Sequence, residues 1–332
     1  MTQNQKMKLL ILWDILQKNS DEDNPLSTNE ILERLKSKGI FATRKAIYED
    51  IRALNEFGYE VLSTRSRRNL YYVVDRSFDE AELRILLDAV AGASFISEKK
   101  TKELAEKIAA LAGASKAEIL KKNVVYTGGA KHSNEKVYYS VDTIDRAIAA
   151  KKKVEFRYFD LDARRQRKYR LRTDGSDRYL VNPVSLIFNE NKYYLTGYND
   201  KYKNLANYRI DKMDDVRVSD EDITPADCVT DFNANKHRKQ AFSMYIGELK
   251  NVTIAVKQNK LDVIYDKFGE DTRFYRYEPG NEDTFKFRAT VQVSPAFFAW
   301  CAQLGEDICI TEPKDVVKEY QTYLKKILDV YR

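Results

Sequence analysis

The sequence predicts an α+β protein that is divided into several domains. Three observations support this fold class. Apolar residues recur with helical spacing through residues 1–57, and a predicted hairpin follows them. Residues 153–220 are rich in aromatic residues and alternate between predicted strands and turns. Residues 250–332 read as β-α-β-β-α-β-α, which is the order of a ferredoxin-like domain with an added helix.

The composition is that of a folded chain, with 43% hydrophobic and 33% charged residues among 332. No stretch approaches the roughly 18 apolar residues of a membrane span. The polar N-terminus carries no secretory signal, and three cysteines without a CxxC pair fit a reducing compartment, so we expect a cytoplasmic protein. The net charge of +6 is concentrated locally, because residues 151–178 hold eleven Lys and Arg against five acidic residues. Such basic patches favour contact with phosphates.

Two short helices with clear start and stop signals follow the first amphipathic helix. Ser27 and Glu30 have the spacing of a capping box, and Gly39 ends the helix that they begin. Thr43 is the predicted N-cap of the next helix, and Gly58 closes it. Two β-like runs, 59–63 and 70–74, then flank a basic segment. Three helices and a hairpin within residues 1–76 are the outline of a winged helix-turn-helix domain, which binds duplex DNA.

The third helix of this domain presents a basic face. Burial of Ile47, Ile51 and Leu54 leaves polar side chains on the opposite side, where a major groove would lie. Arginine can bind guanine through two hydrogen bonds, and Lys, Tyr and Thr can hold phosphates. The alternative is an ordinary solvated helix face. The predicted DNA-binding residues on this face and the hairpin tip are Thr43, Arg44, Lys45, Tyr48, Arg52, Arg65, Arg67 and Arg68.

The remaining boundaries follow from changes in periodicity and composition. Residues 77–135 are a predicted helical linker, and a strand at 137–140 and a helix capped at Asp142 open the β-rich domain, 136–220. Residues 221–247 form an irregular linker to the last domain, 248–332.

Three motifs resemble those of WYL-domain transcription regulators. Thr43–Gly58 resembles their recognition helix, R-T-I-x-R-D-I-x-x-L-x-x-x-G, although Glu49 stands where the family usually has Arg. Lys192–Tyr198 resembles the W-Y-L signature, with Tyr193 in place of Trp, and Tyr208–Met213 resembles F-R-L-D-R-I. The resemblance implies a DeoR-like helix-turn-helix, an Sm-like or SH3-type β-barrel at 136–220, and a C-terminal extension domain.

A ligand site is predicted in the β-rich domain. Strand alternation places Tyr193 and Leu195 on one face and Tyr194 on the other, and it turns Arg209 and Asp211 outward. The predicted ligand-binding residues, Tyr158, Tyr194, Arg209 and Lys212, combine stacking surface with positive charge, which suits a nucleotide or a short single strand. The alternative is that the tyrosines are packing and the cations a solvated rim. The basic stretch 164–172 either widens this site or is a solvated hairpin or a subunit contact.

No enzyme, cofactor or metal site is predicted. His132 and His237 lie in polar segments without ligand spacing, and we expect both at the surface. Cys301 and Cys309 lie on apolar elements and are expected in the core rather than as nucleophiles. The Gly128–Gly129 pair lacks the tail of a phosphate-binding P-loop.

The sequence therefore predicts a ligand-responsive transcription regulator. We expect a homodimeric repressor that binds a palindromic duplex-DNA operator and senses a nucleotide or nucleic-acid effector, without a membrane partner. The family resemblance also implies an association with phage defence. The alternative function is an adaptor that binds RNA or single-stranded nucleic acid without operator specificity.

Overall fold

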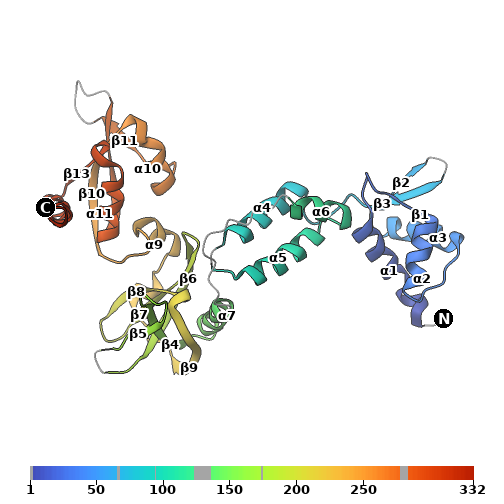
Figure 1. Cartoon of the computed structure of the whole chain (residues 1–332), viewed down its shortest axis with the longest axis horizontal. Helices are drawn as coiled ribbons and strands as arrows, with labels where there is room; N and C mark the ends of the chain where they lie inside the picture. Colours follow the sequence, from blue (N-terminus) through green and yellow to red (C-terminus); the bar gives the residue numbers. More distant parts are fainter. Residues whose placement is uncertain (1–2, 66–67, 94, 123–135, 173–174, 277–282) are drawn as a thin grey trace. The chain divides into compact units, whose positions relative to one another are not determined.

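The computed structural model describes residues 3–332 except 66–67, 94, 123–135, 173–174 and 277–282. Contacts divide the chain into two compact units, 1–135 and 136–332 (Figure 1). Within the described residues, no helix combines the length and apolar character of a membrane span. In the same residues, His, Cys, Asp and Glu side chains do not gather in groups that could hold a metal ion.

The first unit opens with three helices and a small antiparallel sheet whose strand order is β1-β3-β2. Its apolar core joins all three helices through residues such as Leu12, Ile31 and Ile47. The elements are α1 (Gln3–Asn19), β1 (Leu26–Ser27), α2 (Thr28–Ser37), α3 (Arg44–Glu56), β2 (Leu62–Arg65) and β3 (Asn69–Tyr72).

The predicted capping signals of α2 and α3 are confirmed. The Ser27 hydroxyl accepts from the Glu30 amide at 3.3 Å, and a Glu30 carboxylate oxygen accepts from the Ser27 amide at 2.8 Å. Thr43 caps α3 by accepting from the Ala46 amide at 3.3 Å. Gly58 follows α3 with a φ of +86°, a left-handed conformation that favours glycine.

Three further helices follow in the described part of the first unit: α4 (Glu80–Gly92), α5 (Glu98–Ala110) and α6 (Ala114–Lys122). Arg76 connects them to α1. Its guanidinium donates to the backbone carbonyls of Gln17 at 2.7 Å, Ser20 at 2.9 Å and Leu111 at 3.4 Å. The group lies against Gly113, where an added Cβ would stand 2.7 Å from an Arg76 nitrogen. A side chain at residue 113 would therefore displace this guanidinium.

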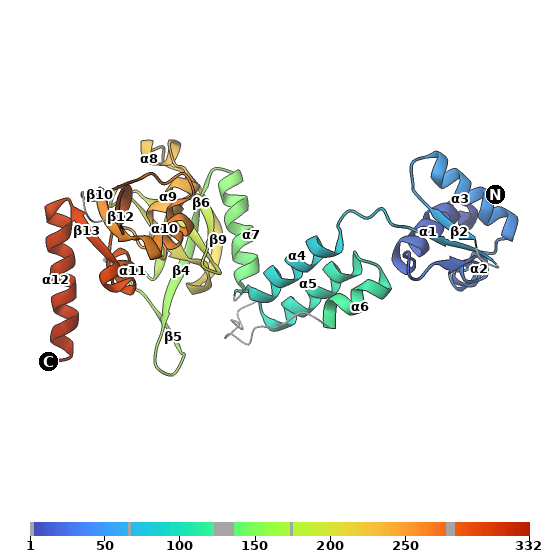
Figure 2. The same ribbon diagram turned by 90° about the horizontal axis from the view of Figure 1, so that it is seen from above.

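The second unit begins with α7 (Lys136–Ala149), which packs on an antiparallel six-stranded sheet (Figure 2). The predicted strand at 137–140 and the cap at Asp142 are wrong, because one helix covers both positions. The sheet is not a closed barrel either. Its order is β5-β4-β6-β7-β8 with β9 on β4, and η1 (Ile210–Lys212) separates β8 from β9. The strands are β4 (Lys152–Leu161), β5 (Arg167–Tyr169), β6 (Arg178–Asn189), β7 (Lys192–Asn199), β8 (Asn204–Arg209) and β9 (Met213–Asp222).

A second sheet, with strand order β11-β12-β10-β13, forms the C-terminal part of this unit. Alternate residues of its central strands, such as Ile254 and Phe287, are fully buried against Phe297 of α11. Two short helices, α8 (Asp227–Thr230) and α9 (Ala234–Gln240), precede it. Its elements are β10 (Glu248–Lys257), η2 (Gln258–Lys260), α10 (Leu261–Phe268), β11 (Phe274–Arg276), β12 (Thr284–Val293), α11 (Pro295–Gln303), η3 (Gly305–Asp307), β13 (Ile308–Glu312) and α12 (Lys314–Val330).

His237 joins the two sheets and is not the surface residue that the sequence predicts. Its ring on α9 is only 8% exposed, and its Nδ1 lies 3.2 Å from the amide nitrogen of Gln292 on β12. Its Nε2 lies 3.1 Å from the amide nitrogen of Asn207 on β8. Burial lowers the pKa of this imidazole. His132, the other histidine, lies outside the described residues, and of the two cysteines expected in the core only Cys301 is buried, because Cys309 is exposed.

Candidate nucleic-acid interface and effector site

The predicted DNA-binding face of α3 is exposed. Ile47, Ile51 and Leu54 are buried on one side of the helix, because they follow its 3.6-residue period toward the core. The side chains on the opposite side are open to solvent: Thr43, Arg44, Lys45, Tyr48 and Arg52. The helix thus separates an apolar contact with its own domain from a polar surface.

Each cation of this face makes only a weak or exposed contact. Arg52 lies 3.0 Å from Glu56, with both side chains more than half exposed, and Lys45 lies 3.9 Å from Glu49. Exposed pairs of this kind contribute little and break readily. Arg44 donates to the side chain of Asn29 on α2 at 3.0 Å. Of the hairpin-tip residues, Arg68 is exposed, Arg65 is on β2 with a side chain that is not described, and Arg67 lies outside the described residues.

The four predicted ligand residues come together on the first sheet of the second unit. Tyr194 and Arg209 are cross-strand partners of β7 and β8, and the Tyr158 hydroxyl accepts from the Arg209 amide at 3.1 Å. Lys212 follows in η1. Strand pairing therefore collects residues that are separated by up to 54 positions in the sequence.

Both tyrosines are buried. Tyr158 is 7% exposed and packs against Phe156, Tyr179 and Tyr208, and burial raises its pKa to about 12. Tyr194 is 6% exposed because the segment after α9 covers its face of the sheet. That segment belongs to the region predicted as an irregular linker. Its apolar residues Ala241 and Met244 were the sequence signal that could have indicated a buried contact.

Both cations are neutralised inside the fold. Arg209 makes two hydrogen bonds to Asp211, at 2.6 and 3.0 Å, and Lys212 lies 2.7 Å from Asp160. The side chain of Asp211 is only 6% exposed, so the predicted outward position of this residue is wrong. Arg170 also binds Asp160, at 2.6 Å, and hydrogen bonds from Arg170 and Lys212 hold the pKa of this carboxyl well below its usual range.

A second charged centre, around Asp214 of β9, escaped the sequence prediction. The carboxylate is nearly buried and accepts from Tyr169 at 2.7 Å, Arg167 at 2.9 Å and Lys136 at 3.0 Å. Burial raises its pKa, but hydrogen bonds from Tyr169 and Lys136 outweigh burial, and the pKa falls to about 2. Beside it lies a hollow of about 500 Å³ between α7 and β9. The buried Nε atom of Arg157 at this hollow has no hydrogen-bond partner among the residues described.

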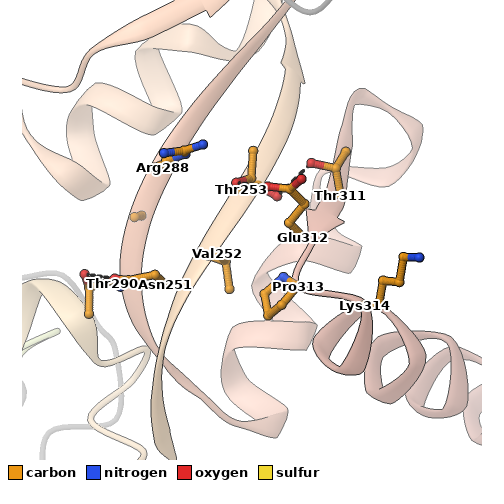
Figure 3. Close-up of a pocket in the computed structure, with 10 residues that line it drawn as sticks. Asn251, Val252, Thr253, Arg288, Thr290, Thr311, Glu312, Pro313 and Lys314 are labelled. Carbon is orange, nitrogen blue, oxygen red and sulfur yellow. Dashed lines mark hydrogen bonds between the residues drawn. The ribbon is translucent and has the colours of Figure 1, made fainter.

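A hollow of about 680 Å³ also lies on the C-terminal sheet, over β10, β12 and β13 (Figure 3). Arg288 of β12 and Lys314 of α12 stand on its two sides, with Thr253 and Glu312 between them. Glu312 accepts a hydrogen bond from the Thr253 hydroxyl at 2.9 Å. None of these residues was singled out from the sequence, because the strands that bring them together are far apart in the chain.

Comparison with known proteins identifies the family of one region of the chain. The search of curated proteins found no match to the chain. Among solved structures, Proteasome accessory factor B/C (PafBC) of Arthrobacter aurescens shares 17% identity and a TM-score of 0.29 over 98% of this chain and 48% of that one. The present chain thus spans about half the length of that protein. A CRISPR Cas-related protein shares 13% identity and a TM-score of 0.36 over 99% of this chain and 84% of that one. Residues 140–218, which include the first sheet of the second unit up to Val218, match the WYL domain family and therefore form a WYL domain.

Proposed function

We propose that this WYL-domain protein is a transcription regulator that binds duplex DNA through α3. The observation that carries the proposal is the division of α3 into a buried apolar side and an exposed side with Arg44, Lys45 and Arg52. The order of three helices followed by the β2–β3 hairpin supports it, because a winged helix-turn-helix has this order. The proposal includes no catalytic step.

The chemistry of the α3 surface suits a major groove. Arg44 at the start of the helix can reach base edges, since the N-terminal residues of a recognition helix contact bases. Arg52 lies two turns further along the same side and suits a phosphate. The exposed Tyr48 hydroxyl can donate to a phosphate between them. The proposal includes a homodimer, because the two-fold symmetry of a palindromic operator matches two copies of α3. Repression and a cytoplasmic location are further parts of the same proposal.

The WYL domain supplies the proposed effector site. An anionic nucleotide or single strand would compete with Asp211 and Asp160 for Arg209 and Lys212, because each cation is already paired. Exchange of these ion pairs would alter η1, which connects β8 to β9, and would thereby couple ligand binding to the shape of the sheet. Binding at this site is expected to change operator affinity.

The experiment compares duplexes from upstream of the protein's own gene with random duplexes of equal length by gel shift. Arg44→Ala is expected to weaken specific binding by about 1–3 kcal/mol if Arg44 reads a base, and Arg52→Ala to lower the affinity for all sequences equally. Lys325→Ala, on the exposed side of α12, is the matched control. Equal binding of upstream and random duplex by the wild-type protein would refute operator recognition.

A further inference from the structure

The open face of the C-terminal sheet carries a long basic groove. Two hollows, of about 680 and 710 Å³, share Arg288, Ala289 and Thr290 as lining and therefore adjoin. Together they run from α9 past β11 and β12 to the beginning of α12. We call this surface the sheet groove. Among the described residues, two carboxylates, Asp271 and Glu312, line it against five cations, which are Lys236, Lys239, Arg273, Arg288 and Lys314.

The five cations of the sheet groove are not neutralised within the described part of the chain. All five are exposed, and none forms a salt bridge with a described carboxylate, although Lys239 and Asp271 both flank Gly269. In the WYL domain, by contrast, Arg209 and Lys212 each hold a carboxylate. A cation without an internal partner contributes little to the fold, but it can bind an external anion without first breaking an ion pair.

The groove also offers one aromatic platform. Tyr275 on β11 is 43% exposed and lines the same hollow as Arg273 and Arg288. Hydroxyl and amide side chains, including Thr272, Thr290 and Asn251, fill the positions between the cations. An exposed aromatic ring beside cations that track along a groove is the arrangement by which proteins bind single-stranded nucleic acids.

We propose that the sheet groove binds single-stranded nucleic acid, with its phosphates on Arg273, Arg288 and Lys314 and one base stacked on Tyr275. A mononucleotide would fill only one of the two hollows and leave the cations of the other without an anion. A duplex keeps its bases stacked inside, so Tyr275 could not reach a base face. The proposal does not depend on operator binding by α3, because it concerns a different surface and a different ligand.

The test measures binding of a fluorescein-labelled oligothymidylate of about 20 nucleotides by anisotropy, since such sites cover roughly 4–16 nucleotides. The full-length chain is used with Arg44→Ala and Arg52→Ala in place, so that α3 contributes little. Adding Arg273→Gln and Arg288→Gln is expected to weaken binding at least about 10-fold. It should also reduce the slope of log affinity against log salt by about 1.4, because each contact with a single strand contributes about 0.7.

The matched control is Lys325→Gln with Lys326→Gln, which removes the same charge from exposed positions of α12 outside the groove. This variant is expected to keep the wild-type salt slope. Circular dichroism confirms that each variant is folded. If the control loses as much affinity as the groove variant, or if the wild type does not bind the oligothymidylate, the proposal is overturned.

Tyr275 provides an independent readout of stacking. Tyr275→Leu is expected to lower the affinity several-fold, whereas Tyr275→Phe keeps the ring and should bind as the wild type does. Photo-crosslinking of an oligonucleotide that carries 5-iodouracil should label the peptide with Tyr275. If the label falls instead on the WYL domain, and Arg209→Ala alone abolishes binding, the single strand belongs to that domain and the proposal is wrong. Operator binding is measured separately on duplex, so the two failures are distinguishable.

Discussion

Three cations of the WYL domain and those of the sheet groove are held in opposite ways. In the WYL domain, Arg167, Arg209 and Lys212 each bind a carboxylate of the same domain. In the sheet groove, Arg273 and Arg288 face solvent without a carboxylate partner among the residues described. The difference shows that local basic charge alone does not indicate a binding surface. What matters is whether the fold already supplies the counter-charge, and this depends on tertiary pairing.

The largest expected effect concerns Asp214, a nearly buried carboxylate of the WYL sheet. Asp214→Asn removes the charge that holds Lys136, Arg167 and Tyr169 together, and we expect a loss of about 3 kcal/mol in unfolding free energy. Urea denaturation at pH 7 measures it. Arg288→Gln in the sheet groove should leave the midpoint unchanged. If both variants were equally stable, the contrast between the two sheets would not hold.

The effect of Asp214→Asn on stability should also depend on pH. The pKa of Asp214 is lowered to about 2, so its contribution is complete above the ordinary pKa near 4 and is lost as the pH falls toward 2. Asp214→Asn should therefore differ most from the wild type at neutral pH and converge with it near pH 2. A constant difference across this range would contradict the assignment.

A smaller effect is expected at the buried Tyr158. Its pKa is raised to about 12 by burial, so its contribution to stability is complete below the unfolded value near 10 and is lost as the pH rises from 10 to 12. Tyr158→Phe removes the hydrogen bond from the Arg209 amide and should lower stability by about 1 kcal/mol at pH 7. Unfolding at pH 8, 10 and 11 should show a shallower alkaline loss in this variant. An unchanged slope would mean that the hydroxyl titrates in solvent.

The smallest effect is expected on α3. Its Lys45 and Arg52 have carboxylate partners, unlike the cations of the sheet groove. These ion pairs are more exposed, however, than those of Arg209 and Lys212 in the WYL domain. Glu56→Ala frees Arg52 from an exposed contact of 3.0 Å and should cost no more than about 0.5 kcal/mol of stability. Duplex affinity should stay the same or rise slightly, because a nearby negative charge is removed. Thermal unfolding and gel shift measure the two quantities, and a clear loss of affinity would place Glu56 in the interface.

Local signals were sufficient for much of the first unit. The Ser27–Glu30 capping box, the Thr43 cap and the glycine after α3 lie within a few residues of the backbone groups that they satisfy, so their spacing alone predicts them. The exposed face of α3 followed from the buried positions of Ile47 and Ile51. The prediction for the start of α7 was wrong. The Tyr138–Tyr139 pair and the β-branched Val137 suggest a strand, whereas every third or fourth residue is buried, as in a helix.

Long-range pairing limited what could be predicted of the site. Strand alternation correctly separated Tyr194 from Leu195, but the sequence did not show that residues 241–244 cover the Tyr194 face. Nor did it show that Asp160 and Asp211 neutralise the predicted cations. His237 looked like a surface residue because its neighbours are polar, and its burial depends on Asn207 and Gln292, which lie 30 and 55 positions away.

The hydrogen bonds of Arg76 couple the movements of helices in the first unit. One guanidinium holds the last turn of α1 and the end of α5 by their backbone carbonyls. Any displacement of α5 must either break these bonds or carry α1 with it, and α1 shares its core with α3. Movement of the helical segment 80–122 would thus be transmitted to α3, the helix proposed to bind DNA, through Arg76 and through the hydrogen bond from Asn24 to Ser115 of α6.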